Sequence, residues 1–253
     1  MSGCLDDYFL SLCHGCGDEI LFFKLRMDLL LTFCTFVDMK GDIRILEVLG
    51  MTVAYGDNVV IDDFSMFLKS GEMVAVTGVS GSGKSSLLRA VLGFVMMDAG
   101  EIRVDGNVVN GGHLDVLRHR VAYVPQDLSF PCESVREVME IPFAFKCNRQ
   151  RRVTPDMWDD VLLRLGLDKG IVEKRLNEIS GGQKQRLMLA VAAMLDKDMV
   201  FLDEPTSALD AHSAALVIDF LKGLALSGKA VLAVTHDRNF AAACDRVIEI
   251  TAK

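Results

Sequence analysis

The feature that most constrains this 253-residue chain is a glycine-rich stretch between an apolar run and a helical pattern. The stretch reads Gly78-Val79-Ser80-Gly81-Ser82-Gly83-Lys84-Ser85, after Met73–Thr77 and before Ser86–Leu92. Glycines at this spacing let the backbone wrap so that successive N–H groups point at phosphate oxygens, and the following helix adds about half a positive charge there. Lys84 can then reach the β- and γ-phosphates of a nucleotide, and the Ser85 hydroxyl can bind Mg²⁺. The pattern predicts a phosphate-binding loop.

Short apolar runs alternate with helical patterns along most of the chain. They are Met73–Thr77, Val121–Val124, Val200–Leu202 and Ala230–Thr235. This alternation is typical of a parallel sheet whose strands are connected by helices. We therefore expect an α/β fold.

Turn signals and a helical pattern add two further parts to this fold. Ser70-Gly71 within Val59–Glu72, and Asp105-Gly106 within Glu101–Val109, predict hairpins. Residues from about 128 to 180 contain no strand-like run. Thr154 and Pro155 there are typical of a helix start, and Gly166 of a helix end, so we expect a mostly helical insertion between two halves of the sheet.

Composition and charge exclude several classes of protein. Hydrophobic residues make up 51% of the chain and charged residues 25%, which is ordinary for a globular domain and excludes low-complexity and collagen-like chains. The net charge of −8 argues against a general nucleic-acid binder, which normally carries a basic surface. The seven cysteines are an odd number in a chain large enough to fold without disulfides, so we expect reduced thiols. Cys13 and Cys16 form a single C-x-x-C pair, which does not favour a zinc site.

The first 38 residues differ in pattern from the rest. Their most apolar stretch, Ile20–Val37, contains Lys24, Arg26 and Asp28, and is therefore not expected to span a membrane. Residues 1–38 either form an N-terminal extension that packs on the domain or on a partner, or precede a natural start at Met39. We favour the second interpretation.

Two acidic residues end the buried strand pattern of Val200–Leu202. Side chains alternate across a strand, so Asp203 and Glu204 can do different work. Asp203 is suited to support a metal ion, with Glu204 facing the attacking water. Two acids after an apolar run can also be a solvated strand end, but their occurrence with a phosphate-binding loop favours the functional interpretation.

A second glycine pair opens a helical pattern at Ser180-Gly181-Gly182-Gln183. Ser180 is a good N-cap, so this can be a simple helix start. Two glycines are poor helix formers, however, and close approach of the backbone to an anion explains them better.

With the phosphate-binding loop, two further segments resemble the ATP-binding subunit of ABC transporters. They are Ile179–Arg186, similar to the family's L-S-G-G-Q signature, and Leu202–Asp210. The three segments occur in family order and spacing, and the resemblance covers roughly residues 43–250. Ile179 replaces the usual leucine, and Val191 stands where many relatives carry arginine; neither is a catalytic position.

This resemblance implies a fold and a set of site residues. The fold is a P-loop NTPase of ABC type, with a mixed sheet core, an antiparallel β subdomain and a helical subdomain at about 128–185, within an ATP-binding domain of residues 39–253. Tyr55 would stack on adenine, Gln126 would sense Mg²⁺ and touch the membrane partner, and His236 would contact the γ-phosphate. The expected catalytic residues are Glu204, His236 and Gln126, and the expected metal-binding residues are Ser85, Gln126 and Asp203. The expected ATP-binding residues are Tyr55, Gly78, Ser80, Gly81, Ser82, Gly83, Lys84, Ser85, Ser86, Ser180, Gly181, Gly182 and Gln183.

The resemblance also implies partners. We expect ATP and Mg²⁺, a head-to-tail dimer with ATP between two copies, and separately encoded integral membrane subunits that hold the chain at the cytoplasmic face of the cell membrane. No nucleic-acid partner is expected. The alternative is a soluble ABC ATPase that moves no solute, such as an iron–sulfur assembly ATPase. The solute and the direction of transport stay open, although Tyr123–Gln126 and Ile141–Phe143 resemble the ATP-binding subunits of iron or metal exporters.

Overall fold

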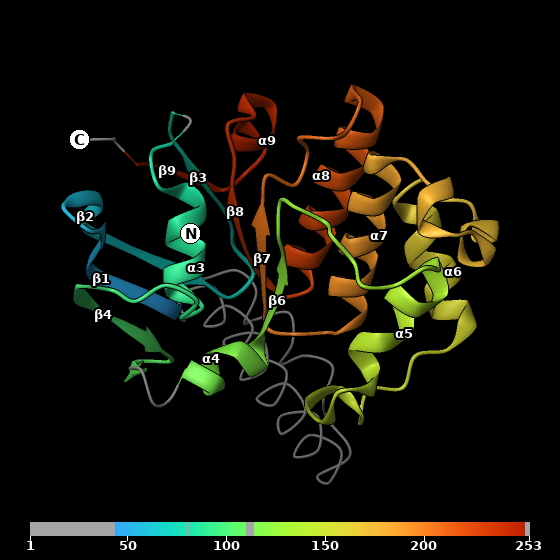
Figure 1. The fold of residues 1–253 in the computed structure, drawn as a ribbon, viewed down its shortest axis with the longest axis horizontal. Helices are drawn as coiled ribbons and strands as arrows, with labels where there is room; N and C mark the ends of the chain where they lie inside the picture. The colour runs from blue at the N-terminus through green and yellow to red at the C-terminus, as the bar shows by residue number, and fades with distance from the viewer. Residues whose placement is uncertain (1–43, 80, 110–113, 251–253) are drawn as a thin grey trace, which may run out of the picture. The chain divides into compact units, whose positions relative to one another are not determined.

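The structure, a computed structural model, describes residues 44–79, 81–109 and 114–250 (Figure 1). All of them belong to one unit, Asp42–Lys253. The predictions made for residues 1–38, for a start at Met39, for the Cys13 and Cys16 pair and for Ser80 fall outside the described residues.

A five-stranded parallel sheet forms the centre of the unit, in the order β6-β7-β8-β3-β9. Its members are β3 (Met73–Thr77), β6 (Val121–Val124), β7 (Met199–Asp203), β8 (Ala230–Val234) and β9 (Arg246–Glu249). All residues of β7 and β8 are buried, as expected for strands covered on both faces. The parallel sheet predicted from the apolar runs is confirmed.

A second, antiparallel sheet has the order β2-β1-β4-β5. It consists of β1 (Arg44–Tyr55), β2 (Asn58–Lys69), β4 (Ala99–Val104) and β5 (Asn107–Val108). The predicted hairpin at Asp105-Gly106 is present between β4 and β5, and both turn residues have positive φ, at 49° and 76°. Together the two sheets confirm the predicted α/β class with an antiparallel part.

The predicted hairpin at Ser70-Gly71 is wrong. A turn does form there, with the Glu72 N–H donating to the Lys69 carbonyl at 3.3 Å and Gly71 at φ 78°. The two strands that it joins lie in different sheets, because β2 pairs with β1 whereas β3 pairs with β8 and β9. A turn signal shows where the chain reverses, but the pairing partner depends on which strands bury matching faces.

Helices cover both faces of the parallel sheet. One core cluster joins α3 (Lys84–Val91) and the antiparallel sheet to the face that carries Phe201 and Leu232. The other joins α7 (Gly181–Met194) and α8 (Ala211–Leu226) to the face that carries Val200 and Ala233. Figure 1 shows α3 on one side of β7 and β8, and α7 and α8 on the other. Two short helices, α4 (Leu114–Arg120) and α9 (Arg238–Ala242), precede β6 and β9.

The chain between β6 and α7 is mainly helical, with an isolated bridge between Ser134 and Arg175. Its elements are α5 (Val135–Ala144), α6 (Pro155–Arg164) and the 3-10 turns η2 (Lys146–Asn148), η3 (Lys169–Glu173) and η4 (Leu176–Glu178). The helix α6 has Thr154 at its N-cap and Pro155 at its first position, and Gly166 follows it at φ 64°, as predicted. The bounds of a separate helical subdomain at 128–185 stay a prediction.

None of the helices within 44–79, 81–109 and 114–250 is long and apolar enough to cross a membrane.

The burial of side chains in β8 allows a direct test of this fold. Leu232 in β8 is completely buried in the cluster that also contains α3 and the antiparallel sheet, whereas Leu226 at the end of α8 is 90% exposed. We expect Leu232→Ala to lower the free energy of unfolding by about 2–5 kcal/mol, and the control Leu226→Ala to change it by less than about 0.5 kcal/mol. Urea unfolding followed by circular dichroism measures both. Equal stability of the two variants would contradict the position of β8 at the centre of the sheet.

Candidate nucleotide site

The strands β3, β7 and β8 end side by side at one edge of the parallel sheet, where several of the predicted site residues lie. β8 lies between β3 and β7, and its last residue, Val234, is opposite both Val76 of β3 and Asp203 of β7. The segments that follow these strands therefore meet at the carboxyl edge, where α/β sheets bind ligands.

The glycine-rich loop between β3 and α3 depends on glycine at two packed positions. A Cβ at Gly78 would meet the Ile250 carbonyl oxygen and Ser82 Oγ, each at 2.6 Å. A Cβ at Gly83, which has φ 89°, would meet Val60 Cγ1 at 2.7 Å. Gly78 and Gly83, at the two ends of the loop, are thus closely packed, and a larger residue would not fit at either position. Gly81, at φ 83°, has open space around it.

Lys84 and Ser82 present polar groups inside this loop. Lys84 is buried, and its Nζ donates to the carbonyl oxygens of Gly78 at 2.8 Å and Val79 at 2.9 Å. Ser82 Oγ is buried and has no hydrogen-bond partner among the described residues. A buried hydroxyl without a partner costs free energy, and a bound anion at this loop would satisfy it.

Asp203 lies next to the start of α3, because Phe201 and Asp203 point to the same face of β7. Ser85 Oγ donates to Asp203 Oδ1 at 3.0 Å. Burial raises the pKa of Asp203, the Ser85 hydrogen bond opposes this rise, and the neighbouring Glu204 charge adds to it. Burial thus disfavours the ionised form of this carboxylate, and a bound cation would favour it.

These oxygen atoms fit a magnesium ion that also binds phosphate. No group of three or more His, Cys, Asp or Glu side chains within the described ranges could hold a metal alone. Mg²⁺ commonly takes one or two carboxylates, together with water and substrate phosphates. The Ser85 hydroxyl and the Asp203 carboxylate supply such a partial set.

Glu204 has an unusual backbone conformation and several partners. Its φ is 52°, in the left-handed region that non-glycine residues rarely adopt, and it is buried. Its Oε2 accepts from Thr235 Oγ1 and from the His236 N–H, both at 3.3 Å, and lies 2.8 Å from His236 Nδ1. The structure therefore brings together two residues that the sequence analysis placed in the site separately.

Two other predicted residues lie near these groups. The Tyr55 hydroxyl is 3.3 Å from Ser86 Oγ, so this half-exposed ring is beside the first turn of α3. Gln126 is exposed, two residues after Val124, which pairs with Leu202 at the end of β7. Both residues thus lie at or beside the carboxyl edge of the sheet.

The segment Ser180–Gln183 begins α7 with a capping box. Ser180 Oγ accepts from the Gln183 N–H at 3.2 Å, and Gln183 Oε1 accepts from the Ser180 N–H at 2.9 Å. A Cβ at Gly182 would meet the Ala208 carbonyl oxygen at 2.9 Å, whereas Gly181 is exposed. The helices α7 and α3 pack on opposite faces of the sheet, and no described hydrogen bond joins Ser180 to the phosphate-binding loop.

The structure adds site residues that the sequence analysis did not select. Gln185, within the signature segment Ile179–Arg186, donates from Nε2 to the Glu204 carbonyl oxygen at 2.7 Å. Thr206 Oγ1 donates to Asp237 Oδ2 at 2.8 Å, and this bond joins the segments after β7 and β8. Burial would raise the pKa of Asp237, but hydrogen bonds from Thr206, Asn239 and Phe240 lower it overall. Asp237 directly follows the predicted site residue His236, and this position in the sequence is the signal by which it could have been selected.

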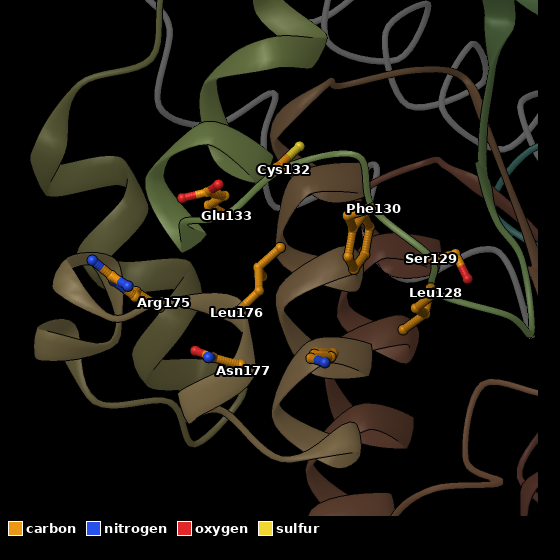
Figure 2. Close-up of a pocket in the computed structure, with 9 residues that line it drawn as sticks. Leu128, Ser129, Phe130, Cys132, Glu133, Arg175, Leu176 and Asn177 are labelled. Carbon is orange, nitrogen blue, oxygen red and sulfur yellow. The ribbon is translucent and has the colours of Figure 1, made fainter.

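A cavity of about 610 Å³ lies beyond Gln126, between the chain after β6 and the helical part (Figure 2). It is lined by Leu128, Ser129, Phe130, Cys132, Glu133, Arg175, Leu176, Asn177 and Lys184. Figure 2 shows Phe130 and Leu128 on the segment that follows β6, with Arg175, Leu176 and Asn177 across the cavity. Lys184 belongs to α7, four residues after Ser180. The cavity thus adjoins both the segment that follows Gln126 and the helix α7, which begins in the signature segment.

The parallel sheet has a phosphate-binding loop after β3 and two buried carboxylates at the end of β7, with β8 between these strands. This combination defines a P-loop NTPase. The chain belongs to the ABC transporter family, whose model matches residues 61–207. It is similar to the manganese transport system ATP-binding protein MntB of Listeria monocytogenes, 31% identical over 215 residues that cover 82% of this chain and 87% of MntB. It is also similar to the glutamate/aspartate import ATP-binding protein GltL of Escherichia coli, 38% identical over 190 residues that cover 74% of this chain and 78% of GltL.

A solved structure gives the same result for the fold. The ATP-binding cassette MJ0796, in a dimeric post-hydrolysis state bound to ADP and Pi, matches with a TM-score of 0.72 and 26% identity. The match covers 82% of this chain and 96% of the cassette. The predicted ABC-type ATP-binding domain is confirmed.

The raised pKa of Asp203 predicts a dependence of stability on pH. An acid whose pKa is higher in the folded chain binds its proton more tightly there, so folding is penalised as pH rises above about 4, the ordinary range of an aspartate. Asp203→Asn removes this penalty. The free energy of unfolding, measured in urea without nucleotide or Mg²⁺ at a series of pH values, should shift in favour of the variant as pH rises from about 4. A difference that stays constant or changes the other way would contradict the burial of an ionisable Asp203.

Proposed function

We propose that this chain is the subunit that binds and hydrolyses Mg²⁺-ATP and thereby powers solute transport through separately encoded membrane subunits. The observation that carries the proposal is the convergence of Lys84, the Ser85–Asp203 pair and the Glu204–His236 pair at one edge of the sheet. The names of both curated relatives, each an ATP-binding protein of a transport system, support it.

The loop residues bind and orient the phosphates. Lys84 Nζ now donates to carbonyl oxygens of Gly78 and Val79, and would donate to β- and γ-phosphate oxygens instead when ATP is bound. Ser85, Asp203 and Gln126 would hold Mg²⁺, which neutralises charge on the phosphates when bound. Tyr55, beside Ser86, is placed to stack on the adenine.

Glu204 is the residue that would orient the attacking water and accept its proton. Its carboxylate is buried next to the segment after β8, and two donors from Thr235 and His236 fix its position. His236 contacts this carboxylate through Nδ1, and its exposed ring leaves the other nitrogen for the γ-phosphate. The two neighbouring acids thus divide the work, with Asp203 toward the metal and Glu204 toward water.

The site is proposed to be completed by a second copy in a head-to-tail dimer. Ser180 and Gly181 are exposed at the N-terminus of α7, where helix N–H groups and the helix dipole favour an anion. They belong to the helix on the face of the sheet opposite to α3, and a second copy would supply them to the γ-phosphate. The dimeric state of the MJ0796 cassette supports this arrangement.

We infer that the membrane subunit contacts the cavity beside Gln126. This cavity is bordered by the Gln126 segment and by α7, so a partner bound there would respond to movement of either. Such contact would hold the chain at the cytoplasmic face of the cell membrane. The likeness to iron or metal exporters stays a prediction, and no observation favours the iron–sulfur assembly alternative.

The role of Glu204 predicts a separation of binding from turnover. Glu204→Gln keeps the shape of the side chain but removes the base, so the steady-state ATPase rate should fall by about 10²–10⁴. Affinity for ATP, measured by calorimetry, should change little because Lys84 and the loop are intact. Glu140→Gln, an exposed position on α5, is the matched control and should keep the parent rate. Turnover by Glu204→Gln within twofold of the parent chain would refute the assignment.

A further inference from the structure

Gln185 is a buried amide that contacts the main chain of the proposed catalytic glutamate. The side chain is 2% exposed and lies on the second turn of α7. Its Nε2 donates to the Glu204 carbonyl oxygen at 2.7 Å, at a separation of 19 residues in sequence. Gln185 contacts neither the phosphate-binding loop nor the Glu204 carboxylate in any described hydrogen bond. Its effect would therefore pass through the backbone of Glu204.

The backbone of Glu204 needs such support. A left-handed φ of 52° at a residue with a Cβ persists only where neighbouring groups hold it. The Glu204 N–H donates to the Val234 carbonyl at 2.9 Å. The Glu204 carbonyl accepts from Gln185, and also from Ser207 Oγ at 3.0 Å and Ser207 N–H at 3.2 Å.

The partners of the Glu204 backbone come from different elements of the structure. Val234 belongs to the neighbouring strand, and Ser207 is only three residues beyond Glu204 in the same turn. Gln185 alone among them belongs to α7, whose first residues are the signature segment. It lies five residues after Ser180, about 7.5 Å along the helix axis. A helix is stiff over that distance, so the position of Ser180 and the position of the Gln185 amide are linked.

We propose that Gln185 is a positioning residue that holds the strained backbone of Glu204 and ties its carboxylate to the signature helix. The proposal rests on the proposed function of Glu204. It implies that binding of a second copy at Ser180 is transmitted through α7 to the group that orients water. Gln185 is therefore expected to affect turnover and not the affinity for ATP.

The test is Gln185→Leu, which keeps the approximate size of the side chain and removes the donor. The steady-state kcat for ATP of the full chain should fall about tenfold, because the free energy of one hydrogen bond corresponds to about that factor in rate. The KM should change less than twofold. Gln185→Met, which is unbranched like glutamine and also lacks a donor, is the second variant if the leucine protein is poorly folded. Leu189→Ala, at a buried position of the same helix whose apolar side chain cannot hydrogen-bond to Glu204, is the control for general loss of packing.

A double-mutant cycle separates positioning from a purely structural effect. In single-turnover measurements on the Glu204→Gln background, adding Gln185→Leu should cost less than twofold, because the carboxylate that it positions is already absent. A loss that persists in this background would overturn the proposal, as would a loss below threefold in the parent chain. If Glu204→Gln itself keeps turnover, the proposed function fails. If Glu204→Gln is inactive and Gln185→Leu is fully active, only the positioning role fails.

Discussion

Parallel pairing of three neighbouring strands is the constraint on which the rest of the structure depends. The register places Val234 at the end of β8 opposite both Val76 and Asp203, so three strand ends lie at one level. β7 and β8 are buried on both faces, and a slip of one residue would exchange the faces of every side chain. The candidate site residues lie on or directly after these three strands, with a glycine-rich loop after β3, two carboxylates at the end of β7 and a histidine after β8.

The two adjacent carboxylates, for which different roles are proposed, also differ in geometry. Asp203 keeps the alternation of β7 and faces α3, where it accepts from Ser85. Glu204 leaves the strand conformation at φ 52°, and its side chain meets Thr235 and His236 instead. Backbone strain at a site is maintained only by surrounding contacts. Gln185 supplies one of them from the helix that also presents Ser180, and this links the two ends of the proposed composite site.

Local sequence patterns predict the α/β fold class and nominate the candidate site residues, whereas the pairing of distant segments is seen only in the structure. The phosphate-binding loop, the strand that ends in Asp203 and the N-cap at Ser180 are local patterns, because neighbouring residues determine them. The sequence analysis assigned both Ser85 and Asp203 to a metal ion, but the hydrogen bond between them, which spans 118 residues, is seen only in the structure. The Ser70-Gly71 turn is predicted correctly, but its two strands join different sheets because β2 pairs with β1, a strand that the sequence analysis did not predict. The role of Gln185 depends on a backbone angle at Glu204 that no side-chain pattern shows.

The central claim is that one ATP is held by the loop of one copy and the signature segment of another. A crystal structure of the Glu204→Gln variant with Mg²⁺-ATP tests it most directly. We expect two copies, with each γ-phosphate in contact with Lys84 of one chain and Ser180 of the other, and with Lys84 Nζ no longer bonded to the Gly78 carbonyl. ATP bound to the loop with no signature segment of a second chain within hydrogen-bond distance would contradict it.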